Sequence, residues 1–135
     1  MLTPKQKGNI SEIEAILSLM REGYNISIPY GDSMPYDFIL DVNGTLIKVQ
    51  NKASSIKDGY IVFSTRHMNK KYQPGTVDFF STTCNGITYM IPSKFCSSGK
   101  RLRIDSPKNN QTKGINYASD YTLDKLESLI KEQIN

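Results

Sequence analysis

The sequence contains no tryptophan, a single histidine, two cysteines and no long hydrophobic run. With only His67 to accompany Cys84 and Cys96, the chain lacks the Cys and His spacing of a zinc site, so two reduced thiols are predicted. No stretch approaches the roughly 20 apolar residues that span a bilayer, and no apolar segment follows the positive charges at the N-terminus. These absences predict a cytoplasmic protein without a membrane partner.

The composition is that of an ordinary globular domain. Hydrophobic residues make up 38% and charged residues 22%, which argues against long disordered segments. A chain of 135 residues is long enough for one core and too short for two, so a single domain over residues 1–135 is expected. The formal net charge of +4 is compatible with a nucleic-acid partner, because cationic side chains displace counterions from phosphates.

Amphipathic helices are predicted at both ends of the chain. In the first, Asn9 or Ser11 is a candidate cap and Gly23 a candidate end. Its apolar residues at helical spacing are Ile10, Ile13, Ile16, Leu17 and Met20. The second helix is predicted behind Thr122 as a possible cap. Its apolar residues are Leu123, Leu126, Ile130 and Ile134.

Strands are predicted between the helices, over residues 24–28, 36–42, 45–52, 60–65, 77–83 and 87–91. Asn43-Gly44 and Asn85-Gly86 are dipeptides preferred in tight hairpin turns, and the polar stretch 97–116 predicts a long loop. Strands enclosed by helices favour an α/β or α+β fold, in which helices pack on a sheet.

The first hairpin brings polar side chains together. If Asn43 and Gly44 form its turn, Asp37 lies opposite Gln50 across the two strands. Because side chains alternate along a strand, Lys52 shares their face. The other face then carries Phe38, Leu40, Ile47 and Val49.

A carboxylate, an amide and an ammonium on one face suit the hydrolysis of a phosphodiester with Mg²⁺. Glu12 supplies a second carboxylate, since it lies at the edge of the apolar face of the first helix, whereas Glu14 is expected to face water. A charged face on an antiparallel hairpin is commonly its solvated side. Spacing alone therefore leaves both interpretations open.

Three segments resemble the motifs of the PD-(D/E)XK nuclease superfamily: Lys7 to Glu12, Pro35-Tyr36-Asp37, and Val49-Gln50-Asn51-Lys52. More narrowly, Gly31 to Asp37 followed by Ile47 to Gln50 is similar to the group I intron-associated PD-(D/E)XK homing endonucleases. The Lys-Gly pair with its following Glu is also similar to archaeal Holliday junction resolvases. The resemblance extends from about Lys7 to Ile91.

The resemblance implies a single-domain, restriction-endonuclease-like core with a mixed central sheet flanked by helices. It also implies that Glu12, Asp37 and Gln50 bind Mg²⁺, with Mn²⁺ as a substitute, and that Lys52 is catalytic. Gln50 stands where most members have Asp or Glu, and an amide is the weaker ligand of Mg²⁺.

The expected activity is metal-dependent cleavage of double-stranded DNA at specific sites. Because one site cuts one strand, a homo-oligomer, dimer or tetramer, is expected for cleavage of both strands. Basic residues expected to contact DNA are Arg66, Lys70, Lys71, Arg101 and Arg103. Solvated loops are the alternative interpretation of these segments.

Three competing hypotheses stay open at this stage. The first is a structure-selective nuclease similar to Holliday junction resolvases. The second is a DNA-binding module that keeps the fold without turnover, for which Gln50 is the best argument. The third is an unrelated α/β protein whose hairpin charges are accidental, and it predicts no metal dependence.

Overall fold

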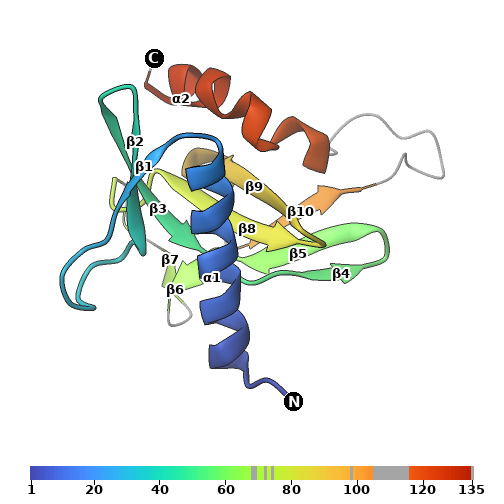
Figure 1. Cartoon of the computed structure of the whole chain (residues 1–135). Helices are drawn as coiled ribbons and strands as arrows, with labels where there is room; N and C mark the ends of the chain where they lie inside the picture. Colours follow the sequence, from blue (N-terminus) through green and yellow to red (C-terminus); the bar gives the residue numbers. More distant parts are fainter. Residues whose placement is uncertain (68–69, 72, 74, 98, 105–115, 135) are drawn as a thin grey trace.

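The computed structural model describes residues 1–134 except 68–69, 72, 74, 98 and 105–115. Two helices, α1 (Pro4–Arg21) and α2 (Leu126–Ile134), accompany a central sheet (Figure 1). In spatial order, the five strands of that sheet are β1 (Asn25–Ser27), β2 (Phe38–Val42), β3 (Thr45–Asn51), β8 (Phe79–Cys84) and β9 (Ile87–Pro92).

Shorter elements complete the chain. A second sheet has the order β10 (Gly99–Arg103), β5 (Tyr60–Ser64) and β4 (Ser55–Lys57). The strands β6 (Arg66–His67) and β7 (Lys70–Lys71) pair with each other. The 3-10 helices are η1 (Ser93–Phe95), η2 (Ala118–Asp120) and η3 (Leu123–Lys125).

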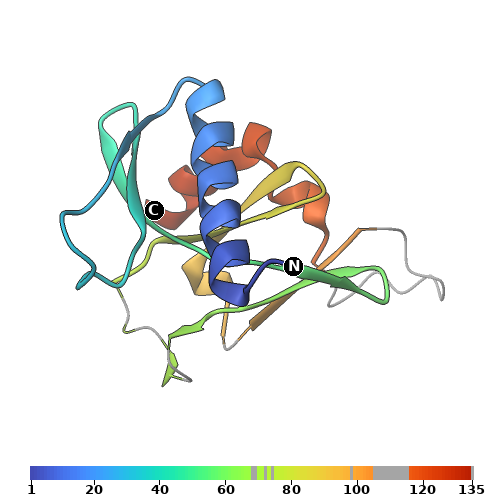
Figure 2. The same ribbon diagram turned by 60° about the horizontal axis from the view of Figure 1, so that its bottom comes forward.

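The central sheet is mixed, as the resemblance implies. All its neighbouring strands are antiparallel except β3 and β8, which run parallel with Val49 opposite Phe79 and Asn51 opposite Ser81. Figures 1 and 2 show α1 and α2 on opposite faces of this sheet. The sheet is therefore covered on both sides, and the predicted α/β class is confirmed.

Helix α1 begins earlier than the predicted caps. Thr3 is the N-cap, its hydroxyl accepts from the backbone N–H of Gln6, and the Gln6 side chain accepts from the Thr3 N–H. Pro4 fits the first turn because its missing N–H would have no partner there. The assignment of Asn9 or Ser11 as the cap is therefore wrong, whereas the end near Gly23 (φ +93°) is confirmed.

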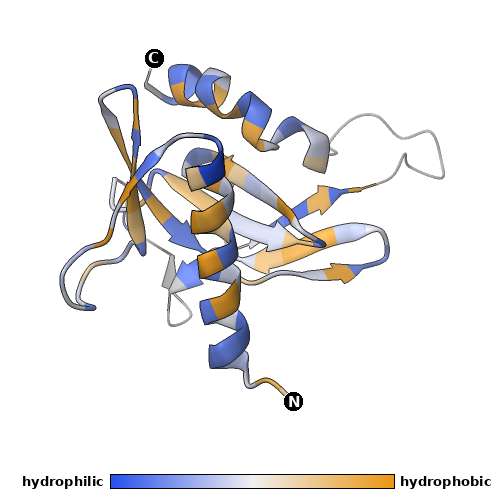
Figure 3. Cartoon of the chain, viewed as in Figure 1, coloured by the Kyte–Doolittle hydropathy of each residue, from blue (hydrophilic) through white to orange (hydrophobic). Residues whose placement is uncertain are grey.

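The inner face of α1 also differs from the prediction. Its buried residues are Ser11, Ala15 and Leu19, and Ile16 is partly buried against the core. The other apolar residues are exposed, with Ile10 at 43%, Ile13 at 63%, Leu17 at 45% and Met20 at 57%. Small side chains let the helix approach the sheet closely, and the hydroxyls of Ser11 and Ser18 hydrogen-bond to it. Figure 3 shows hydrophobic residues along the length of this helix.

The hairpin of β2 and β3 has the predicted register, with Val42 opposite Thr45 and Phe38 opposite Val49. Its predicted apolar face is buried: Phe38, Leu40, Ile47 and Val49 are all at most 4% exposed. Burial of side chains of this size stabilises the fold by roughly 1.5–3 kcal/mol each. This rigid core fixes the residues on the opposite face of the hairpin.

Two expectations for the second half of the chain need correction. The C-terminal helix starts at Leu126, because residues 123–125 form the 3-10 helix η3 instead, and the Thr122 side chain makes no capping hydrogen bond. Part of the predicted loop 97–116 is the strand β10, which pairs with β5 through the backbone. Cys84 and Cys96 are free, as predicted. Neither described helix is long and apolar enough to span a bilayer.

Candidate active site

Asp37 lies directly before β2 and is held by the backbone of β3. Its backbone N–H donates to the Val49 carbonyl at 2.8 Å, and its Oδ2 accepts from the Asn51 N–H at 2.8 Å. Both bonds follow from the confirmed hairpin register, which continues from Phe38 opposite Val49 to Asp37. The position of this carboxyl is therefore set by the backbone of β3 rather than by a loose turn.

Glu12, half-buried on α1, shares a hydrogen bond with the Asp37 carboxyl. Burial and then the negative charge of Asp37 raise the pKa of Glu12 from 4.5 to about 7. Burial also raises the pKa of Asp37, although the Asn51 N–H, Glu12 and Lys52 all act to lower it. With a pKa of about 7, Glu12 takes up a proton as the pH falls through neutrality.

Lys52 follows β3 and completes the group. Its backbone N–H donates to the Ser81 carbonyl and its Nζ donates to the Arg66 carbonyl, both at 2.8 Å. Burial lowers the pKa of this ammonium, while the charge of Asp37 opposes the shift. Lys52 is therefore a desolvated cation within the electrostatic reach of Asp37, as the hairpin face predicts.

Gln50 is half-buried, and its side chain makes a local contact. Its Nε2 donates to the Asn51 carbonyl at 3.4 Å, a long hydrogen bond. The structure thus brings Glu12, Asp37 and Lys52 together, whereas the described contacts of the Gln50 amide involve neither carboxyl. A ligand role for Gln50 stays a prediction.

Asn51 is the residue of this region that the sequence argument overlooks. Its side chain is 7% exposed and lies between Ser11 Oγ at 3.0 Å and Ser81 Oγ at 2.8 Å. The alternation that buries Val49 also buries Asn51, and a buried amide needs hydrogen-bond partners. That signal was present in the sequence.

The donor set fits a hard divalent cation. Glu12 and Asp37 supply adjacent carboxylate oxygens, and a cation bound between them would remove their mutual repulsion. Among the described residues, no three His, Cys, Asp or Glu side chains gather at one place. Glu12 and Asp37 are the two carboxyl side chains that the described contacts bring together at this site.

The predicted DNA-contact residues fall in two places. Arg66 begins β6 beside Lys52 and pairs with Lys71 of β7, and His67 pairs with Lys70. The side chains of Lys70 and Lys71 lie outside the described part of the chain.

Arg101 and Arg103 belong to β10 of the second sheet. Their guanidinium groups lie 4.1 and 4.9 Å from the centre of the Tyr60 ring, and Arg103 Nη1 donates to the Asp58 carbonyl. Stacking of this kind holds a cation on a surface.

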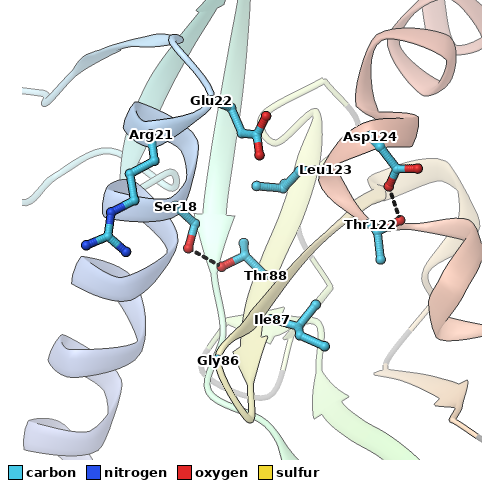
Figure 4. A pocket seen from close by; sticks show the side chains of 9 residues that line it. All are labelled: Ser18, Arg21, Glu22, Gly86, Ile87, Thr88, Thr122, Leu123 and Asp124. Carbon is cyan, nitrogen blue, oxygen red and sulfur yellow. Dashed lines mark hydrogen bonds between the residues drawn. The ribbon is translucent and has the colours of Figure 1, made fainter.

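A cavity of about 360 Å³ lies away from the carboxyl pair. Figure 4 shows it between the end of α1, the turn of β8 and β9, and η3, with Glu22 and Asp124 on its two sides. None of Glu12, Asp37 and Lys52 lines it. The candidate active site is therefore a separate surface site.

Comparison with known proteins identifies a family and a similar fold. A family model described as PD-(D/E)XK endonuclease matches residues 2–124. The solved structure of a bacterial homing endonuclease, I-Ssp6803I, has a similar fold, with a TM-score of 0.72 and 24% sequence identity over 100% of both chains. No curated protein sequence matches the chain.

Proposed function

The chain belongs to the PD-(D/E)XK endonuclease family, and we propose that it cuts double-stranded DNA at specific sites in a Mg²⁺-dependent reaction. The observation that carries the proposal is the placement of the Glu12 and Asp37 carboxyls in contact with each other, with Asp37 fixed by the Asn51 N–H and Lys52 fixed by the Arg66 carbonyl. The similar fold of a bacterial homing endonuclease supports a site-specific enzyme rather than a general nuclease.

Each residue of the group has a distinct task in this proposal. Glu12 and Asp37 would hold Mg²⁺ through their carboxylate oxygens, with Glu12 in its ionised form. The ion would supply polarisation of the phosphate and a water molecule of lowered pKa. Lys52, held by Ser81 and Arg66, stabilises the negative charge that develops on the phosphate. Gln50, in β3, would contribute an amide oxygen as a further ligand of the cation.

Cleavage assays with the full chain test this proposal. The protein would be incubated with a plasmid library of genomic segments and with a synthetic four-way junction, with Mg²⁺, Mn²⁺ or EDTA. We expect linear plasmid at one or a few sites with either cation and no product with EDTA. Preference for the junction would instead establish a resolvase-like enzyme. Binding without cutting in either cation would contradict an enzymatic role.

We further propose that the enzyme acts as a homo-oligomer, because one carboxyl pair cuts one strand. The exposed residues Ile10, Ile13, Leu17 and Met20 support this, since they recur every three or four residues along α1. Such spacing forms the seam between two packed helices. A second copy of the chain is the partner that would cover them.

Charged side chains among these exposed apolar residues of α1 are expected to dissociate the oligomer. Replacing Ile13 and Leu17 together by Glu should weaken self-association by at least about 100-fold, because burial of two charges replaces burial of two apolar side chains. Sedimentation velocity against concentration would measure it. Glu14→Gln is the control, since Glu14 is exposed on the same helix. A wild-type protein that stays monomeric at high concentration would contradict the proposal.

A further inference from the structure

Asn51 is connected to both carboxyl residues of the site. Through its main chain, the N–H of Asn51 donates to Asp37 Oδ2 at 2.8 Å. Through its side chain, the residue reaches α1 at the turn that carries Glu12. Asn51, a single residue at the end of β3, therefore contacts the Asp37 carboxyl and the helix that carries Glu12.

The partners of the Asn51 amide determine its orientation. With Oδ1 towards α1, this oxygen accepts from the Glu12 N–H at 3.1 Å and from Ser11 Oγ at 3.0 Å. Nδ2 then donates to the carbonyl and the hydroxyl of Ser81, at 3.2 and 2.8 Å. Ser11 is 7% exposed and Ser81 is fully buried. The amide is thus satisfied at both ends in a dry environment, where hydrogen bonds hold geometry firmly.

We propose that Asn51 is a positioning residue that sets the separation of the Glu12 and Asp37 carboxyls for metal binding, an inference that rests on the proposed function. Mg²⁺ requires oxygen ligands at about 2.0–2.1 Å in a nearly ideal octahedron. A small displacement of α1 along the sheet would therefore change the separation of the Glu12 and Asp37 carboxyls and weaken metal binding. The amide prevents that displacement by locking the Glu12 turn to Ser81, the register partner of Asn51 on β8.

A purely structural role is the competing explanation, and the fold contains a matched control for it. Thr88 Oγ1 donates to Ser18 Oγ at 2.9 Å and contacts Thr83 Oγ1 at 2.7 Å. Figure 4 shows this second polar link between α1 and the sheet. It joins the same helix to the same sheet through a residue only 4% exposed, but it touches neither carboxyl residue.

Calorimetric titration with Mn²⁺ alone tests the proposal without turnover. We expect Asn51→Leu to weaken Mn²⁺ binding by roughly 10–100-fold, the range seen when groups that orient metal ligands are removed. Ser81→Ala should weaken it less, because the Ser81 carbonyl still accepts from the amide. Thr88→Val should bind Mn²⁺ like the wild type although its melting temperature falls. In cleavage assays, Asn51→Leu should need more Mg²⁺ for half-maximal rate with an unchanged KM for DNA.

The outcomes distinguish a failure of the positioning role of Asn51 from a failure of the proposed function. Wild-type Mn²⁺ affinity in folded Asn51→Leu, or an equal loss in Thr88→Val, would overturn the positioning role and leave the proposed function intact. If Asn51→Leu does not fold, Ser81→Ala decides, and wild-type affinity in that variant overturns the inference. Two results would overturn the proposed function as well. One is a wild-type protein that binds no Mn²⁺, and the other is an Asp37→Asn variant that binds Mn²⁺ with wild-type affinity.

Discussion

Asp37→Asn is expected to reduce DNA cleavage by at least about 10³-fold, which corresponds to about 4 kcal/mol of lost transition-state stabilisation. The amide keeps the shape of the side chain and can still accept from the Asn51 N–H, so the hairpin should fold normally. It lacks the charge that is proposed to hold Mg²⁺ and that interacts with Lys52. Single-turnover cleavage at saturating protein would measure the loss.

Asp41→Asn is the matched control for this variant. Asp41 lies in β2, four residues after Asp37, but its carboxyl accepts from the Gly44 N–H in the turn. Its cleavage rate should stay within about twofold of wild type. Equal losses in both variants would indicate a general effect of charge on the hairpin, and an active Asp37→Asn protein would exclude Asp37 as a metal ligand.

Glu12→Gln is expected to have opposite effects on activity and on the stability of the metal-free protein. Cleavage should fall by roughly 10²–10³-fold, because one of two carboxylate ligands is lost. At pH 8 in EDTA, however, the variant should be more stable than the wild type by about 1 kcal/mol, after allowance for solvent screening of this partly exposed group. Urea denaturation at pH 5 and pH 8 would measure the difference.

The sign of this effect follows from the pKa of Glu12. Folding raises that pKa from 4.5 to about 7, so the folded metal-free state binds the proton more tightly than the unfolded state. The resulting stabilisation is fully present below about pH 4.5 and is lost as the pH rises through about 7. The wild type should therefore lose stability between pH 5 and pH 8, whereas the Glu12→Gln variant, whose amide is neutral at every pH, should not. Equal pH dependence in both proteins would contradict the raised pKa of Glu12.

The hairpin of β2 and β3 was predictable because its turn residues have little freedom. Asn43 and Gly44 both adopt positive φ, +53° and +90°, which the Asn-Gly dipeptide tolerates well. Once the turn is placed, the register pairs Phe38 with Val49 and buries both, and it brings Asp37 to the end of β3. Glu12 was harder, since its place at the edge of a predicted apolar helix face indicates contact with the sheet but does not say which strands it meets.

The orientation of α1 was not predictable from hydropathy. The spacing of Ile10, Ile13 and Leu17 suggests an inner face, yet the fold buries Ser11 and Ala15. The packing depends on the close approach of α1 to the sheet and on hydrogen bonds from its hydroxyl groups. A hydropathy pattern reports neither of these. The strand β10 was missed for a related reason, because backbone pairing with β5 builds it and Leu102 is its single buried residue.

The parallel pairing of β3 with β8 has a consequence for the order of folding. The β2 and β3 hairpin closes over a two-residue turn, so it forms locally and early, with Asp37 already in place. Ser81 lies 30 residues beyond Asn51 and joins only after a long loop has closed, which is a slow step. The Asn51 amide then gains its second set of partners. An incomplete chain that ends before β8 therefore lacks Ser81, the partner that links Asn51 and α1 to the rest of the sheet.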